Sequence, residues 1–237
     1  MRGDEKMRVP GRPLLADLFC CAGGAAMGYH RAGFDVVGFD IKPQPRYPFK
    51  FVQCDALEVD LSAFDAVHAS PPCQGYSWAA KRWTGVDRAY LIEPTRAMLK
   101  ASGLPYVIEN VPGAPLVNPA RLCGEMFGLN VIRHRNFETN WMLMVPDHKP
   151  HRRPVTRKAR DGSERVVQRS AYCTVAGHGG ESDSFRFEDW QAAMGMDWTS
   201  RDELTEAIPP AYTQFIGTQL LAILASTTAT DAMERNG

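Results

Sequence analysis

The sequence contains no long apolar run, no excess of charge of either sign and no cysteine pair at the spacing of a metal site. No stretch is long enough for a transmembrane helix, and the first residues lack the apolar core of a signal peptide. We therefore expect an intracellular, cytoplasmic protein without membrane contact. The 27 basic and 27 acidic residues cancel, so the net charge alone indicates no nucleic-acid partner.

Cysteine and histidine are scattered along the chain. Cys20 and Cys21 are adjacent, and the other four cysteines stand far apart. We interpret most of the cysteines as small buried residues in a reducing compartment. The histidines of the second half show no convincing ligand pattern either, so we expect no metal site. They are His134, His148, His151 and His178.

A strand, a glycine turn and a helix are predicted at the start of the chain. Residues 14–19 form an apolar strand pattern, Cys20 to Gly24 follow as a turn, and residues 25–32 have a helix-forming composition that Gly33 closes. Such a unit presents free backbone N–H groups at a helix start, beside the carboxyl ends of the strands. A glycine turn is common, so by itself it is a weak indication of a ligand site.

Two acidic residues strengthen that indication. Asp40 follows a second predicted strand, residues 34–39, and Asp55 follows a third, residues 49–54. An acid at the end of the second strand is where Rossmann-like folds bind ribose hydroxyls. The turn and the two acids together predict a nucleoside-binding site.

The segment around Cys73 combines a predicted strand with a stiff loop. Residues 63–69 form a mostly apolar run that predicts a buried strand, and Pro71 and Pro72 restrict the backbone that leads to Cys73. Gly75 then allows a turn or the close approach of a ligand. A cysteine presented in this way suggests a nucleophile, and the alternative is a buried structural thiol in a turn.

Glu109 ends a second apolar run, residues 106–108. A carboxylate at the carboxyl end of a buried parallel strand is unfavourable unless it is paired or used. We therefore count Glu109 among the candidate functional residues.

Positive charge concentrates between residues 148 and 169. Eight lysines and arginines lie there, and only Asp161 and Glu164 oppose them, so the segment carries about +6 and the rest of the chain about −6. Asp161-Gly162 between short apolar stretches predicts a hairpin turn. A basic hairpin suits contact with phosphates, and the alternative is a solvated loop.

Several motifs occur in an order and at spacings that resemble the DNA cytosine-5 methyltransferases dependent on S-adenosylmethionine. Four of them are Asp17-Leu18-Phe19, Gly23-Gly24, the Pro-Pro-Cys-Gln of residues 71–74, and Glu109-Asn110-Val111. Three further matches are Arg133-His134-Arg135, Ala193-Met194-Gly195-Met196 and Ala207-Ile208-Pro209-Pro210. The chain departs from the family pattern at Cys21, at Val131 and at Thr205-Glu206.

The resemblance implies a role for each matched residue. Cys73 would be the nucleophile on carbon 6 of cytosine, Glu109 would hold the base, and Arg133 and Arg135 would complete the catalytic set. S-adenosylmethionine would be bound by Asp17, Phe19, Gly23, Gly24, Asp40, Ile41, Asp55 and Pro72. DNA would be contacted by Ser77, Lys81 and Arg82 in the loop after Cys73, and by Arg157, Lys158 and Arg160 in the basic segment. For the loop after Cys73, the alternative is an ordinary surface loop without a role in binding.

The implied fold is α/β, with a mostly parallel, Rossmann-like sheet and a small, partly β target-recognition insertion. We expect the catalytic domain to comprise residues 1–145, completed by residues 206–237, and the recognition region to comprise residues 146–205. The partners would be double-stranded DNA and a cognate restriction endonuclease, for a monomer of prokaryotic or phage type. Three alternatives remain: an RNA (tRNA) cytosine-5 methyltransferase, an inactive DNA-binding homologue, and a donor that carries a bulkier group.

Overall fold

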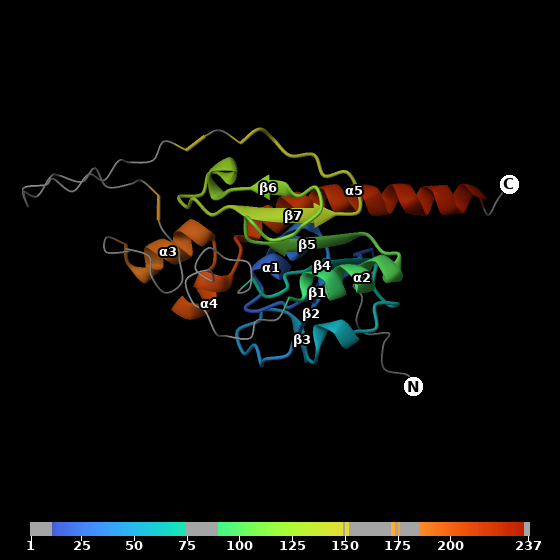
Figure 1. Ribbon diagram of the computed structural model, residues 1–237, viewed down its shortest axis with the longest axis horizontal. Coiled ribbons are helices and arrows are strands. Elements are labelled where there is room, and N and C mark those ends of the chain that lie inside the picture. Colours follow the sequence, from blue (N-terminus) through green and yellow to red (C-terminus); the bar gives the residue numbers. More distant parts are fainter. Residues whose placement is uncertain are drawn as a thin grey trace, which may run out of the picture.

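The computed structural model describes residues 11–73, 90–148, 150–151, 172–173, 175 and 185–234, with side chains as far as residue 226. The fold is a central seven-stranded sheet with helices on both faces (Figure 1). Its strands are β1 Leu14–Leu18, β2 Asp35–Asp40, β3 Lys50–Gln53, β4 Ala66–Ala69, β5 Tyr106–Asn110, β6 Ala120–Leu122 and β7 Arg135–Thr139.

The sheet is mostly parallel, as the sequence predicted. Its strand order is β3-β2-β1-β4-β5-β7-β6, and β7 pairs antiparallel with both β5 and β6. In the parallel part, Leu18 is opposite both Phe39 and Ala69, so β1, β2 and β4 end at the same edge. Ala69 is in turn opposite Ile108 of β5. This register gathers the residues after each strand at one edge, where ligands bind in open α/β sheets.

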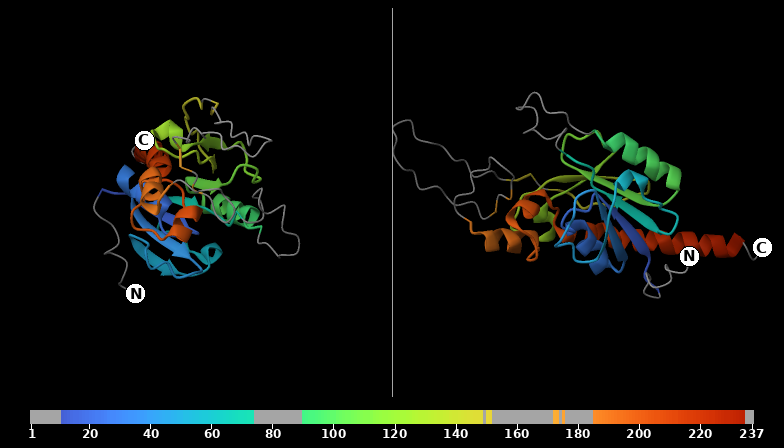
Figure 2. Two further views of the ribbon diagram at one scale, coloured as in Figure 1. Left: turned by 90° about the vertical axis from the view of Figure 1, so that its left-hand side faces the viewer. Right: turned by 90° about the horizontal axis from the view of Figure 1, so that it is seen from below.

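The helices and short 3₁₀ turns cover both faces of the sheet (Figure 2). They are α1 Gly24–Ala32, η1 Ala56–Glu58, α2 Ile92–Ser102, η3 Gly124–Phe127, α3 Phe187–Met194, α4 Arg201–Glu206 and α5 Pro210–Glu234. On one face, Tyr29 of α1 and Ile216 of α5 share a core with Leu15. On the other, Leu99 of α2 packs with Leu14 and other strand residues near η1. Alternate residues of β1 thus face the two cores, as a strand buried on both sides requires.

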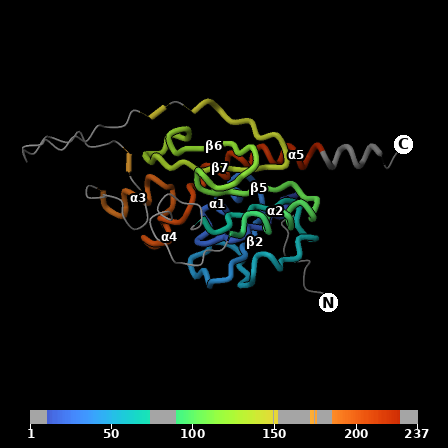
Figure 3. The backbone as a smooth tube through the Cα atoms, in the orientation of Figure 1, coloured from blue at the N-terminus to red at the C-terminus, as the bar shows by residue number. Residues whose placement is uncertain are grey.

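Small residues allow α1 and α5 to approach closely. A Cβ atom on Gly28 would lie 2.2 Å from the carbonyl oxygen of Pro210, and one on Gly217 would lie 2.8 Å from the Cβ of Ala32. The hydroxyl of Thr213 also donates to the carbonyl of Ala25 at 2.8 Å. The C-terminal helix therefore packs directly on the helix that follows the first glycine turn. Its far end extends past the sheet (Figure 1), and Figure 3 shows the course of the backbone between these elements.

A third, smaller core lies beside the sheet. Val131 packs there with Trp190 and Met194 of α3, Leu204 of α4, and Cys173. Val131 and Cys173 also form an isolated parallel bridge. In the described part of residues 146–205 the regular elements are these two helices, and the predicted hairpin around Asp161-Gly162 lies outside the described residues.

The elements fall close to their predicted positions. The expected strands 14–19, 34–39 and 49–54 correspond to β1, β2 and β3, and the helix expected at 25–32 corresponds to α1. The terminal helix, expected to end near residue 226, continues to Glu234. Within the described residues, none of the helices combines the length and hydropathy needed to cross a membrane. The division at residues 145 and 206 stays a prediction.

Candidate active site

Cys73 lies in a loop that leaves the end of β4. The amide of Ser70 donates to the carbonyl of Leu18 at 3.1 Å, and the side-chain amide of Asn110 donates to the carbonyl of Pro71 at 2.8 Å. These bonds fix the loop against β1 and β5, and Cys73 itself is half-buried. Burial raises the pKa of the Cys73 thiol, the charge of Glu109 adds to the rise, and Arg135 opposes it. The three side chains therefore form one electrostatic group.

Glu109 lies at the neighbouring strand end and is buried. Desolvation raises the pKa of its carboxyl, against the opposing charge of Arg135 and a hydrogen bond from Ser70. Its Oε1 lies 3.1 Å from Nε of Arg135, which is close enough for an ion pair. The angle of this contact is not that of a hydrogen bond, and no other described residue donates a hydrogen bond to Oε1. Glu109 thus combines a tendency to stay protonated with an oxygen that a ligand can use.

Behind Glu109, a chain of hydrogen bonds leads into the core, which sequence reasoning did not find. The hydroxyl of Tyr29 lies 3.1 Å from Nδ1 of His68, and Nε2 of His68 lies 2.9 Å from Oγ of Ser70. Ser70 in turn hydrogen-bonds Glu109. Burial lowers the pKa of His68 to about 3, so the imidazole is neutral and relays hydrogen bonds without charge. A polar residue within the apolar strand β4 was the signal available in the sequence.

The two arginines before and at the start of β7 have different surroundings. Arg135 faces Glu109, whereas Arg133 is buried and donates to the carbonyls of Val175 at 2.7 Å and Thr205 at 2.6 Å. Burial lowers the pKa of Arg133 to about 9. Arg133 therefore joins the sheet to the segments around residues 175 and 205. Its predicted catalytic role stays a prediction, and its contacts are those of a positioning residue.

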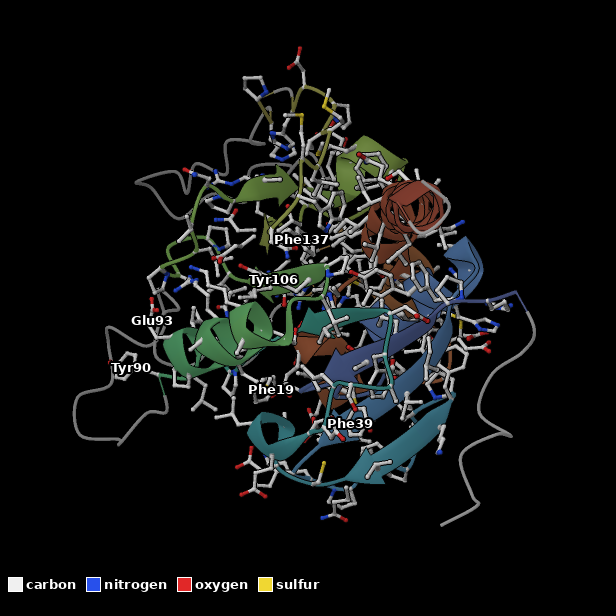
Figure 4. All side chains as sticks on the ribbon, turned by 90° about the vertical axis from the view of Figure 1, so that its right-hand side faces the viewer. Phe19, Phe39, Tyr90, Glu93, Tyr106 and Phe137 are labelled. Atoms are coloured by element: carbon white, nitrogen blue, oxygen red, sulfur yellow. The ribbon has the colours of Figure 1, made fainter. Side chains whose placement is uncertain are left out.

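The first turn has the backbone of a tight ligand-binding loop. Phe19, Cys21 and Gly23 all have positive φ, of 57°, 44° and 79°. Such conformations are unfavourable for residues other than glycine and cluster at ligand sites. Cys21, where the family usually has glycine, occupies this conformation while its amide donates to Oδ2 of Asp40 at 3.1 Å. Phe19 is half-buried and packs on the α2 side of the sheet, near η1 (Figure 4).

The predicted cofactor residues around Asp40 lie along the same edge. The two carboxylate oxygens of Asp40 accept from the amides of Cys21 and Lys42, and each retains a further lone pair. The next side chain, Ile41, is 66% exposed. Asp55 is exposed and caps η1 by accepting from the amide of Leu57 at 2.9 Å.

Asp17 and Gly24 lie deeper. Asp17 is fully buried, and burial raises the pKa of its carboxyl well above the usual value. The hydroxyl of Tyr47 donates to its Oδ2 at 3.2 Å, and a backbone contact from Ala26 also lowers the pKa of the carboxyl. No aligned hydrogen bond reaches Oδ1 from the described residues. Gly24 packs against backbone, since a Cβ there would lie 2.4 Å from the carbonyl oxygen of Ile208. Pro72, beside Cys73, is exposed.

The residues predicted to contact DNA cannot be placed in this site. Ser77, Lys81, Arg82, Arg157, Lys158 and Arg160 all lie outside the described residues. The described structure therefore brings together the predicted nucleophile, base-binding and cofactor residues.

A Rossmann-like sheet with a cysteine and a glutamate at adjacent strand ends is the arrangement of α/β transferases that bind a nucleoside cofactor at that edge of the sheet. The family model of the C-5 cytosine-specific DNA methylase matches residues 15–119, which include Cys73 and Glu109. Type II methyltransferase M.HgiGI of Herpetosiphon aurantiacus is 30% identical over 115 residues, which cover 42% of this chain and 91% of that protein. The chain belongs to the C-5 cytosine-specific DNA methylase family.

Other relatives are matched over a smaller share of their length. Type II methyltransferase M.XorII of Xanthomonas oryzae pv. oryzae is 32% identical over 122 residues, or 43% of this chain. The match to M1.HphI of Haemophilus parahaemolyticus is 31% identical over 101 residues. These matches span only 29% and 26% of the two relatives.

Solved structures show the same fold. The Dnmt2 methyltransferase of S. pombe superposes with a TM-score of 0.60 at 13% identity, over 90% of this chain and 99% of that one. The methyltransferase EhMeth of Entamoeba histolytica gives 0.51 at 11% identity, over 92% and 99%. At such identities the likeness concerns the fold alone.

Proposed function

We propose that this protein transfers the methyl group of S-adenosylmethionine to carbon 5 of cytosine in a short DNA sequence. The observation that carries the proposal is the grouping of Cys73, Glu109 and Arg135 at the ends of β4, β5 and the start of β7. The family match and the names of the curated relatives favour DNA as substrate.

Cys73 would supply the nucleophile. Carbon 5 of cytosine is a poor nucleophile until a thiolate adds to carbon 6, which breaks the 5,6 double bond and makes the ring enamine-like. Burial raises the pKa of Cys73, so the thiolate needs a compensating positive charge. Arg135, which opposes that rise, is the described residue that provides one.

Glu109 would hold the pyrimidine ring. In its protonated form, one oxygen donates to ring nitrogen 3 and the other accepts from the exocyclic amine. The raised pKa of Glu109 favours this form, and its unaligned Oε1 is available to a ligand. Hydrogen bonds aimed at nitrogen 3 stabilise the negative charge that develops there when the thiolate adds.

After thiolate addition, carbon 5 would take the methyl group while the sulfur–methyl bond of the donor breaks, which would leave S-adenosylhomocysteine. A base acting through water then removes the proton from carbon 5, and Cys73 leaves as the double bond re-forms. A base stacked in a duplex cannot reach Cys73, so the target cytosine must be flipped out of the helix.

The first turn fits the cofactor. Asp17 presents a buried oxygen that no aligned hydrogen bond reaches from the described chain, Asp40 retains acceptor capacity, and Ile41 offers an exposed apolar surface beside it. We propose that Asp40 binds the ribose hydroxyls, that Phe19 and Ile41 contact the adenine, and that Asp55 accepts from its amine. The bound cofactor would supply an electrophilic methyl group at a sulfonium centre.

The partners remain part of the proposal. The basic segment and the loop after Cys73 would contact double-stranded DNA, and a restriction endonuclease of the same specificity would be the biological partner of a monomeric enzyme. The type II names of the relatives support this interpretation. A tRNA substrate is the second candidate, because the same fold with a short recognition region suits an RNA loop.

Parallel assays on duplex DNA and on tRNA test the proposal. The enzyme is supplied with methyl-labelled S-adenosylmethionine, and bisulfite sequencing locates the modified cytosines. We expect label on cytosine carbon 5 in DNA and none with Cys73→Ala. Label on tRNA alone would favour the second candidate, and binding of DNA without transfer to either substrate would favour an inactive homologue.

A further inference from the structure

A cluster of three imidazoles and one thiol lies beside the candidate active site. Its members are Cys123, His134, His148 and His151, and their possible ligand atoms all lie within 4.8 Å of one another. Cys123 follows β6, His134 directly precedes β7, and His148 and His151 belong to the segment that leaves β7. Three separate chain segments thus meet at one point.

Two distances between ligand atoms of the cluster lie close to those of a tetrahedral metal site. Nε2 of His151 lies 3.1 Å from Nε2 of His134 and 3.4 Å from Sγ of Cys123. The edges of a tetrahedral zinc site are about 3.3 Å between two nitrogens and about 3.6 Å between nitrogen and sulfur. The three imidazole rings also lie together, with centroids 4.7–5.1 Å apart.

Two further contacts point to a ligand rather than to simple packing. Nε2 of His148 is buried and has no hydrogen-bond partner among the described residues. Nδ1 of His151 lies 2.6 Å from a carboxylate oxygen of Glu125, close enough for an ion pair although not aligned as a hydrogen bond. The other oxygen of Glu125 accepts from the hydroxyl of Tyr172 at 2.7 Å. A carboxylate on the far nitrogen of a histidine fixes the ring and the tautomer that metal-binding histidines use.

We propose that Cys123, His134, His148 and His151 bind a structural Zn²⁺ ion. Four protein ligands close the coordination sphere, so the ion has no open position for substrate. It would cross-link the end of β6, the start of β7 and the segment that leads into the predicted recognition region. Since His134 lies between Arg133 and Arg135, the ion would also fix the backbone that positions both arginines.

The sequence argued against a metal site, because the Cys/His spacings of 11, 14 and 3 match no familiar ligand pattern. The pair His148 and His151, three residues apart, was the only local signal. The fold supplies the other two ligands from either side of η3.

Metal analysis of the full chain, purified without a polyhistidine tag or chelator, tests the proposal. We expect one zinc ion per chain in the wild type, and the same in Cys54→Ser, a matched cysteine variant. Cys54 follows β3, at the opposite edge of the sheet from β6. Cys123→Ser and His151→Asn should lose the ion, and Glu125→Gln should weaken zinc binding by about 10–100-fold.

Replacement of zinc by Co²⁺ gives a second readout that needs no variant. Tetrahedral cobalt with one thiolate ligand shows intense visible d–d bands and a near-ultraviolet sulfur-to-cobalt charge-transfer band. Zinc added to the chelator-treated wild type should also raise its melting temperature, and should not raise that of His151→Asn. Equal zinc content in Cys123→Ser and Cys54→Ser, or wild-type protein that binds no Co²⁺, would overturn the proposal and leave a hydrogen-bonded cluster.

Discussion

The side-chain amide of Asn110 donates a 2.8 Å hydrogen bond to the carbonyl oxygen of Pro71, and so joins the end of β5 to the loop that carries Cys73. Oδ1 of the same side chain accepts from the amide of Val111 at 2.9 Å. Because Asn110 is buried and adjoins Glu109, it holds the loop that carries Cys73 at a fixed position relative to the Glu109 carboxyl.

Asn110→Ala should therefore slow methyl transfer while leaving cofactor affinity unchanged. The loss of one buried hydrogen bond is worth about 1–3 kcal/mol, which corresponds to about 5–150-fold in single-turnover rate. Asn140→Ala is the matched control, because Asn140 bonds the backbone of Tyr106 and Leu104 at the opposite end of β5. If both variants lose stability but neither loses rate, Asn110 has no positioning role.

The pH dependence of methyl transfer should show two limbs. The raised pKa of Cys73 makes the rate rise with pH as thiolate forms, and the raised pKa of Glu109 makes it fall as the required neutral carboxyl ionises. Ionisation of Glu109 is less favourable in the folded than in the unfolded protein. The free energy of unfolding should therefore fall as the pH rises from the unfolded-state pKa of this carboxyl to its higher folded-state pKa.

Glu109→Gln should lower the rate by about 10²–10⁴-fold and abolish the descending limb, since the amide does not titrate. Rate profiles against pH, with the exposed carboxylate variant Asp60→Asn as control, provide the measurement. If the descending limb is unchanged in Glu109→Gln, the ionisation that causes it belongs to another residue.

Arg96 and Glu138 form a buried ion pair that fixes α2 against β7. Nε and Nη2 of Arg96 donate to the two carboxylate oxygens of Glu138 at 2.7 and 2.8 Å. Arg96→Met leaves Glu138 buried without its cation and should cost about 3–5 kcal/mol in free energy of unfolding. Arg46→Met, which removes the exposed pair with Glu203, should cost about 0–1 kcal/mol. Urea denaturation measures both free energies of unfolding. Equal losses in Arg96→Met and Arg46→Met would show that burial of the ion pair does not determine its contribution.

Neutralising Arg157, Lys158 and Arg160 should weaken DNA binding and flatten its salt dependence. The slope of log K against log salt should fall by about 0.9 for each phosphate that the variant no longer neutralises, while affinity for S-adenosylmethionine stays the same. With few side chains available to reach base edges, we also expect a recognition site of about two to four base pairs. A strict site of six or more base pairs in a methylome map would place recognition elsewhere.

The sequence was sufficient to predict the parallel part of the sheet. Residues 14–19 and 34–39 are apolar runs with sharp ends, and parallel strands buried on both faces have this pattern. Because the register of such strands aligns their carboxyl ends, the positions of Asp40, Cys73 and Glu109 at one edge followed from strand ends alone.

Features that depend on long-range contacts were not predictable from the sequence. The catalytic role of Arg133 stays a prediction, and its hydrogen-bond partners, which are carbonyls 42 and 72 residues away, follow from no local pattern. The relay from Tyr29 through His68 to Ser70 requires α1 to pack on β4, which no local pattern specifies. Likewise, Cys123 meets His151 only because β6 and β7 pair side by side.

Covalent trapping tests the central claim most directly. Duplex DNA with 5-fluorocytosine at the target position is incubated with the protein and S-adenosylmethionine, and the adduct is mapped by peptide mass spectrometry. Because fluorine on carbon 5 cannot leave as a proton does, we predict a stable bond between Cys73 and carbon 6 of the base, absent in Cys73→Ala and retained in Cys54→Ser. An adduct on any other cysteine, or methylation at full rate by Cys73→Ala, would contradict the account.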